Sequence, residues 1–179
     1  MKPGAKEKWQ LDASDPCEYH YVEARRGREF LLRMTTGTDI IMALTQFGMD
    51  KDIRFAKVHA AFMGGLQPAI LKVWTPDPRD PSNWHTEMPA TIHNLSMILS
   101  MSGMISIRSD GKTEKPYAVA HIVIGGGWDV PTIGGHLMEG SIVKGVLEVF
   151  ITELLDIDVI VSPFKDQMRG SENWYKEVK

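Results

Sequence analysis

The sequence has one cysteine, Cys17, among its 179 residues. A single cysteine excludes an internal disulfide and any cysteine-rich zinc module. The sequence also lacks an apolar run of the ~20 residues that a membrane-spanning helix needs, and its first residues contain no signal-peptide core. These absences predict a cytoplasmic protein that has no membrane partner and folds in a reducing compartment.

Positive charge is not in excess either. The chain has 20 Lys and Arg residues against 23 Asp and Glu residues, which gives a formal net charge of −3. Nucleic-acid-binding domains usually carry a clear basic excess, so this balance counts against direct DNA binding as the main role. The length is that of one domain, and 43% apolar residues suffice for a core without a metal or disulfide staple.

Most apolar residues recur with the period of two that is typical of β-strands. One segment, residues 38–48, has a helical period instead, with Ile40, Ile41 and Leu44 on one face and Gly48 at its predicted end. The pattern predicts an α+β fold in which one principal helix packs on a mainly antiparallel β-sheet. Strands are expected at residues 19–34, 55–62, 69–74, 90–95, 97–108, 117–124, 141–154 and 158–161.

The two ends of the chain are polar. We expect an N-terminal arm at residues 1–18, a domain at residues 19–162 and a polar C-terminal tail at residues 163–179. Within the domain, the proline-rich segment 75–82 is predicted to be a loop.

Arg26-Gly27-Arg28 resembles the core of an AT-hook, an extended arginine segment that lies in the minor groove of DNA. A hook also needs a proline after the second arginine and further basic flanks. Here Glu29 follows, and residues 30–32 are apolar like a strand. We therefore interpret the motif as a tight turn with solvated arginines.

Glycines cluster at residues 125–127 and 134–135. Neither cluster has the spacing of a P-loop or of a dinucleotide fingerprint, so both are interpreted as turn or close-packing glycines. The second cluster directly precedes His136. The absence of side chains there would let this segment approach a neighbouring strand closely.

Histidine is the most informative residue type, with six copies. His121 lies within an otherwise apolar predicted strand, His59 lies in an alternating one, and His136 follows the glycine pair. Each could be a hydrogen-bonded structural residue. Alternatively, the three neutral imidazoles could converge at about 2.0–2.1 Å on one metal ion, with water in a fourth position. The spacing leaves both alternatives open.

The run at residues 134–140 (GGHLMEG), preceded by a strand at residues 116–125 that carries His121, resembles the plants-and-prokaryotes conserved (PPC) domain. The resemblance is to the stand-alone prokaryotic type without an AT-hook, and it spans residues 20–162. Further segments are similar to parts of the same family, at residues 28–44, 53–66 and 95–105.

This resemblance implies an α+β domain that assembles as a homotrimer. In plants the domain follows AT-hooks in nuclear DNA-binding proteins, and stand-alone copies are labelled DNA-binding by analogy. Some stand-alone members hold a metal through histidines of the strand before the loop and of the Gly-Gly-His segment. The family commonly shows His-x-His on that strand. This sequence has Val119 and then His121, so His59 could supply the missing ligand.

Two hypotheses follow from these observations. The first is a small-molecule site, which could be catalytic, built on a divalent metal held by His59, His121 and His136. Glu139, three residues past His136, is the nearest candidate general acid or base. Imidazole ligands suit zinc, nickel, copper or iron, and zinc is the expected metal. The second hypothesis is a DNA-binding or regulatory interaction protein that acts through its surface.

Overall fold

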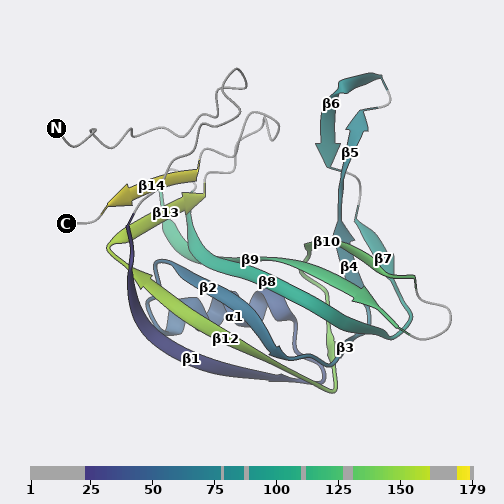
Figure 1. Cartoon of the computed structure of the whole chain (residues 1–179), viewed down its shortest axis with the longest axis horizontal. Coiled ribbons are helices and arrows are strands. Elements are labelled where there is room, and N and C mark those ends of the chain that lie inside the picture. Colours follow the sequence, from purple (N-terminus) through teal and green to yellow (C-terminus); the bar gives the residue numbers. More distant parts are fainter. Residues whose placement is uncertain are drawn as a thin grey trace.

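The computed structural model describes residues 23–77, 79–86, 89–109, 112–126, 131–161 and 173–177. Within these residues the chain forms one helix and fourteen strands, and the predicted α+β fold is confirmed (Figure 1). The helix is α1 (Ile40–Asp50). The strands are β1 (Arg25–Thr35), β2 (Ala56–Phe62), β3 (Gly65–Leu66), β4 (Ala69–Lys72), β5 (Trp74–Asp77), β6 (Asp80–Thr86), β7 (Ala90–Ile92), β8 (Ser96–Ser109), β9 (Glu114–Gly125), β10 (Ile133–Leu137), β11 (Val143–Lys144), β12 (Val146–Leu155), β13 (Ile157–Val161) and β14 (Asn173–Glu177).

Twelve of the strands form one sheet. Its main path runs β1-β12-β2-β8-β9-β10-β4-β7, and neighbours along this path are antiparallel. Strand β13 pairs in parallel with β8 and antiparallel with β14. Strands β5 and β6 form a separate two-stranded ribbon. Figure 1 shows the large sheet curving around α1, with the β5–β6 ribbon projecting from it.

Helix α1 packs its apolar face on the inside of this curved sheet. Asp39 caps the N-terminus of the helix, where a carboxylate oxygen accepts a hydrogen bond of 3.0 Å from the Met42 amide. The sequence predicts that the helix ends at Gly48, but the helix continues to Asp50. Gly48 is buried beside Ile105 of β8, where a β-carbon would lie 2.8 Å from that side chain. The helical residues of the core are Ile40, Ile41 and Leu44, and its strand residues include Val58, Ile105, Ala118, Ala120, Leu147, Val149 and Ile151.

The arginine motif near the N-terminus is not the predicted tight turn. Arg26, Gly27 and Arg28 belong to β1, which pairs with β12 and has a bulge between Arg26 and Glu29. The guanidinium of Arg28 donates hydrogen bonds of 2.7 Å to both carboxylate oxygens of the buried Glu153. A buried carboxylate needs such a partner, and this pairing holds the Arg28 guanidinium against the sheet while the side chain stays 51% exposed.

Two further segments differ from their predictions. The described residues of segment 75–82 are mostly strand: all except Arg79, which lies in a turn, belong to β5 and β6, which pair with each other. Each strand of a two-stranded ribbon has an outer edge, where a proline without an N–H group is tolerated. Part of the predicted C-terminal tail forms β14 against β13. The predicted arm at residues 1–18 lies outside the described residues. No helix in the described part of the chain is long and apolar enough to cross a membrane.

Candidate functional site

Five residues on five neighbouring strands form one row across the sheet. His59 of β2 lies opposite Ser102 of β8, which lies opposite His121 of β9. His121 lies opposite His136 of β10, which lies opposite Lys72 of β4. Directly opposed residues project from the same face of a sheet. On each of these strands a directly adjacent residue is buried in the core, so the row faces away from α1.

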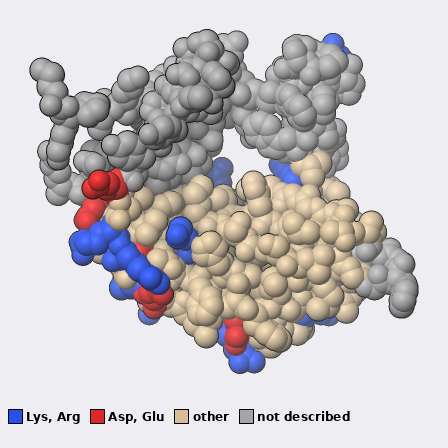
Figure 2. All heavy atoms as spheres, viewed as in Figure 1, with Lys and Arg blue, Asp and Glu red and all other residues tan. Residues whose placement is uncertain are grey.

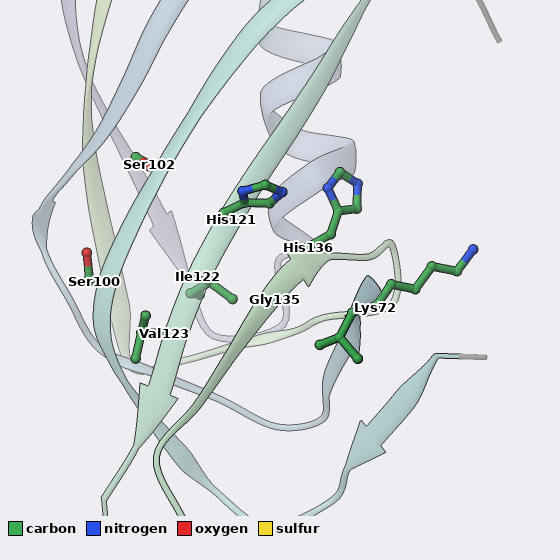
Figure 3. A pocket seen from close by; sticks show the side chains of 9 residues that line it. Lys72, Ser100, Ser102, His121, Ile122, Val123, Gly135 and His136 are labelled. Atoms are coloured by element: carbon green, nitrogen blue, oxygen red, sulfur yellow. The ribbon is translucent and has the colours of Figure 1, made fainter. Parts of the chain in front are cut away.

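His121 and His136 are the closest pair of imidazoles in this row. Their ring centroids are 5.3 Å apart, and the ring planes are inclined by 77°. Figure 3 shows the two rings side by side on adjacent strands, with a nitrogen of each ring on the side that faces the other ring. The antiparallel register of β9 and β10 fixes this arrangement because the two residues are direct cross-strand partners.

The spacing of the two rings suits a shared metal ion. A ring nitrogen lies about 1.1 Å from the imidazole centroid and about 2.0–2.1 Å from a bound zinc ion. Two imidazoles on one tetrahedral zinc therefore have centroids about 5.2 Å apart. The observed 5.3 Å agrees with this value, although edge-to-face contacts of unliganded rings have similar spacings. Imidazole nitrogens are donors that suit zinc, and the ring spacing is compatible with a shared ion.

The protonation state of His136 also suits a ligand. Burial is the main cause that lowers the pKa of His136, and the neighbouring His121 and the positive charge of Lys72 lower this pKa further. A lowered pKa keeps the imidazole neutral at pH 7, and only the neutral ring has a lone pair for a metal. His136 is half-buried, whereas His121 is exposed, so the pair is reachable from solvent.

A pocket of about 540 Å³ surrounds the pair. Its size is that of sites that take small molecules. None of its lining residues is acidic, and Lys72 is the one that carries a permanent positive charge. The pocket is lined by Lys72, Val73, Ser100, Ser102, His121, Ile122, Val123, Gly135 and His136 (Figure 3).

Glycine before His136 allows the close approach of β10 to β4. A β-carbon at Gly135 would lie 2.6 Å from the Lys72 carbonyl oxygen, which is far inside van der Waals contact. A β-carbon at Gly134 would lie 3.1 Å from the Ile122 carbonyl oxygen on the other side. The prediction that these are close-packing glycines is confirmed.

The segment after β10 is anchored to the helix and to β4. The Gly140 amide donates a hydrogen bond of 2.5 Å to the Asp39 carboxylate, which also caps α1. The buried Ser141 hydroxyl accepts from the Ile70 amide at 2.9 Å and donates to the Ile70 carbonyl oxygen at 3.2 Å. These bonds hold the segment that follows His136 and so help to restrict where its ring can lie.

The structure separates two of the predicted site residues from this pair. His59 is in the same row and on the same face, but β8 lies between β2 and β9. Two strand spacings put the Cα atoms of His59 and His121 roughly 10 Å apart. Glu139 is exposed in the turn after β10 and does not line the pocket. Its charge acts on Tyr117, whose pKa is raised first by burial and then by Glu139.

Two of the four predicted site residues are thus brought together. Among the described residues, no group of three or more His, Cys, Asp or Glu side chains is placed to hold a metal ion. His59 as third ligand and Glu139 as acid or base stay predictions.

Sequence reasoning missed Lys72, Ser100 and Ser102, which line the pocket. A signal for them was present in the alternation of the strands. Lys72 follows the buried Leu71 in a predicted strand, and the two serines flank the buried Met101. Alternation assigns these residues to an outer face of the sheet. It cannot show that the histidines lie on the same face and in the same row, because that depends on strand order and register.

Known proteins share this sequence pattern and this fold. The model of the Plants and Prokaryotes Conserved (PCC) domain matches residues 21–155. No curated protein matches the sequence significantly.

Three solved structures have a similar fold. A metal-containing protein from Archaeoglobus fulgidus is 22% identical in sequence, with a TM-score of 0.66. The match covers 90% of this chain and 100% of the Archaeoglobus chain. A plant- and prokaryote-conserved (PPC) protein from Pyrococcus horikoshii has the same sequence identity and TM-score. The match covers 90% of this chain and 99% of the Pyrococcus chain. A candidate DNA-binding protein from Bacteroides thetaiotaomicron is 20% identical, with a TM-score of 0.61, covering 86% and 97%. At these identities the likeness shows the fold alone.

Proposed function

The chain belongs to the Plants and Prokaryotes Conserved domain family, and from this premise we propose that it binds a divalent metal, zinc first, at a site for a small molecule. His121 and His136 are the proposed ligands. The observation that carries this proposal is the direct cross-strand pairing of the two imidazoles, with centroids 5.3 Å apart. A cytoplasmic setting is part of the proposal, in line with the single cysteine.

The third protein ligand in this proposal is His59. It lies in the same row, and the small side chain of Ser102 stands between it and His121. An imidazole nitrogen lies about 4.5 Å from its Cα atom and about 2 Å from a bound zinc ion, so two histidines on one ion have Cα atoms at most about 13 Å apart. Three strand spacings put the Cα atoms of His59 and His136 roughly 14 Å apart, so His59 can join the other two ligands only if β2 and β10 draw closer together.

A bound zinc ion would supply a Lewis acid that polarises a substrate oxygen or lowers the pKa of a bound water. The residues of this chain have separate tasks. His121 and His136 present neutral ring nitrogens, and the hydrogen bonds of the segment after β10 keep His136 in register with His121. Val73 and Val123 line the pocket with apolar surface, on which the body of a small molecule can pack.

Zinc binding by the purified chain tests the proposal. We expect one zinc per chain in elemental analysis after equilibration and gel filtration, with saturable binding in calorimetry. His121→Ala and His136→Ala should each lower the zinc affinity by more than about 100-fold, because each removes a ligand. His59→Ala should lower it less if two ligands remain. His93→Ala is the matched control, since His93 is exposed and lies outside the row. Unchanged zinc binding in both His121→Ala and His136→Ala would overturn the proposal.

A homotrimer is the second part of the proposal, and exposed apolar side chains on the described surface support it. Phe150 and Leu31 are 54% and 57% exposed, and they extend the row of His59 toward β1. Monomers rarely leave a large contiguous apolar patch in water. Most of the described surface in Figure 2 is uncharged, with basic and acidic side chains together at its margins. Other exposed apolar residues outside the pocket are Met42, Met49, Phe62, Leu95, Met97 and Leu99.

Light scattering tests the assembly. The wild-type chain should give three times its mass of 20.1 kDa at micromolar concentration. Phe150→Asp should shift the mass toward one chain, because a buried carboxylate at an apolar interface is costly. Lys57→Asp on the same face is a control for added negative charge. A monomer mass for the wild-type chain would contradict the trimer.

Direct DNA binding is not favoured. The arginines of the AT-hook-like motif are engaged in ion pairs, Arg26 with Glu29 and Arg28 with Glu153. Arg25, next to them, pairs with Asp156. These carboxylates partly neutralise the local positive charge that would attract phosphates. We therefore expect no sequence-selective binding to duplex DNA near physiological salt in an anisotropy titration. Sub-micromolar selective binding would instead favour the DNA-binding hypothesis.

A further inference from the structure

Lys72 gives one end of the pocket a positive charge. It is half-buried, lies directly opposite His136 on β4, and lines the pocket. No carboxylate is among the lining residues, and no ion pair joins Lys72 to an acidic residue in the described part of the chain. A half-buried lysine in a pocket without a carboxylate favours an anionic group from outside the chain.

The opposite end of the pocket offers neutral hydrogen-bonding groups. Ser102 lies beside His121 in the row, and Ser100 lies opposite Val123. Both serines are exposed, and their hydroxyls can donate to or accept from a ligand oxygen. Figure 3 shows the serines on one side of the two histidines and Lys72 on the other. A ligand in this pocket therefore lies across the histidine pair.

The wall between these two ends is apolar. Val73, Ile122 and Val123 line the pocket, and Gly135 contributes backbone only. The Lys72 side chain extends away from the two imidazole rings in Figure 3, and its four rotatable bonds allow the ammonium group to turn toward a ligand. The lining therefore combines one cation, neutral hydroxyls and a short apolar wall.

We propose that this pocket takes a small oxyanion, a carboxylate or phosphate compound, whose negative group pairs with the Lys72 ammonium. This proposal rests on the proposed metal site. The body of the ligand would lie over Val73 and Val123, and its remaining oxygens would face His121, His136 and Ser102. A zinc ion on the two histidines would make the pocket more positive, because neither imidazole brings a negative charge. A neutral or cationic compound of the same size gains nothing from Lys72.

Probe anions of matched size test this assignment. Acetate and inorganic phosphate are titrated into zinc-loaded wild-type protein, with amide chemical shifts in NMR as the readout, and acetamide serves as the neutral counterpart of acetate. We expect acetate and phosphate to shift resonances of β4, β9 and β10, whereas acetamide should not. Lys72→Met should weaken both anions by about 10-fold or more, and Lys72→Arg should retain them. Lys57→Met is the matched control, since Lys57 is exposed on the same face but outside the pocket.

The outcomes separate this assignment from the proposed metal site. If Lys72→Met binds both anions like wild type, or if acetamide binds as well as acetate, the oxyanion assignment is overturned, whatever the zinc content. If the protein holds no zinc, the metal proposal fails on elemental analysis, and the same titrations are run on the metal-free chain. Lys72-dependent binding of acetate or phosphate there would still support the oxyanion site, and its absence would overturn it. Preference between acetate and phosphate then tells which kind of oxyanion the pocket favours.

Discussion

Gly135 lies so close to β4 that a β-carbon at this position would stand 2.6 Å from the Lys72 carbonyl oxygen. The two residues belong to the strands that carry His136 and the proposed anion-binding lysine. The absence of a side chain at Gly135 therefore allows the close spacing of β10 and β4, and with it the spacing of His136 and Lys72.

Gly135→Ala should push β4 and β10 apart. Relief of a contact with backbone requires a strand to move, so we expect a loss of about 1–3 kcal/mol in the free energy of unfolding. Zinc affinity should fall as well, because His136 moves with its strand. Urea denaturation and zinc titration measure the two effects. Gly134→Ala is a graded control, since its β-carbon would meet the Ile122 carbonyl oxygen at 3.1 Å and a smaller shift relieves it. Equal stability of Gly135→Ala and wild type would contradict the prediction.

The Arg28–Glu153 pair should make stability depend on pH. Hydrogen bonds from Arg28 hold the pKa of Glu153 below its ordinary value of 4.5. A lowered pKa in the folded state means that the pair stabilises the fold above the unfolded pKa. This contribution is lost as the pH falls through the folded pKa. Glu153→Gln should therefore cost about 1–3 kcal/mol at pH 7 and much less at about pH 3.

Denaturant unfolding at the two pH values measures this difference. Glu148→Gln is the control, because Glu148 pairs with the exposed Arg33, and exposed pairs contribute only about 0–1 kcal/mol. A loss in Glu153→Gln that is the same at both pH values would show that the carboxylate charge has no part in it.

Asp39 couples the start of α1 to the segment that follows His136. Its carboxylate accepts from the Met42 amide and from the Gly140 amide. Asp39→Ala removes both hydrogen bonds and should cost about 1–2 kcal/mol of folding free energy. Zinc affinity should also fall, since the segment that positions His136 loses an anchor. Asp39→Asn has one acceptor oxygen in place of two, so it can replace only one of these hydrogen bonds and should recover only part of the losses, as thermal unfolding and zinc titration will show. If Asp39→Ala loses stability but binds zinc as wild type does, the coupling to the site is refuted.

Alternation and helical period predicted the helix and most of the long strands, including the strand that carries His121. They did not predict β5, β6, β10 or β14. They failed where an element depends on a distant partner. The sequence does not reveal that Arg28 pairs with Glu153, because the two residues are 125 positions apart. The prolines of segment 75–82 led to the prediction of a loop. A two-stranded ribbon that does not pack on the core has no alternation of apolar and polar residues that would have indicated its strands.

The candidate site could be predicted only in part, because the order and register of strands decide it. His121 and His136 meet because β9 and β10 are neighbours with these residues in register. His59 is two strands from His121 because β8 lies between β2 and β9, and nothing in the sequence near His59 encodes that order. Lys72 joins the row through the pairing of β4 with β10, which lie far apart along the chain.

Zinc occupancy should fall as the pH decreases from 7 to 5. A protonated imidazole cannot coordinate a metal, so binding is present above the histidine pKa values and is lost as the pH drops through them. Burial lowers the pKa of His136 below its ordinary value of 6.5, so this ring stays available to lower pH than a free histidine. The metal-free fold should also lose stability as the pH falls, since the unfolded chain takes up the proton of His136 first.

Zinc titrations between pH 5 and pH 8 measure this dependence, and calorimetry in buffers of different ionisation enthalpy counts the protons released on binding. The wild-type chain should release protons at pH 6, where part of the histidine population is protonated, and fewer at pH 8. His93→Ala should leave both the affinity and the proton count unchanged, because its ring is outside the row. A zinc affinity that is the same at pH 5 and pH 7 would mean that imidazole nitrogens are not the ligands. Carboxylates, which stay ionised in that range, would then have to hold the ion.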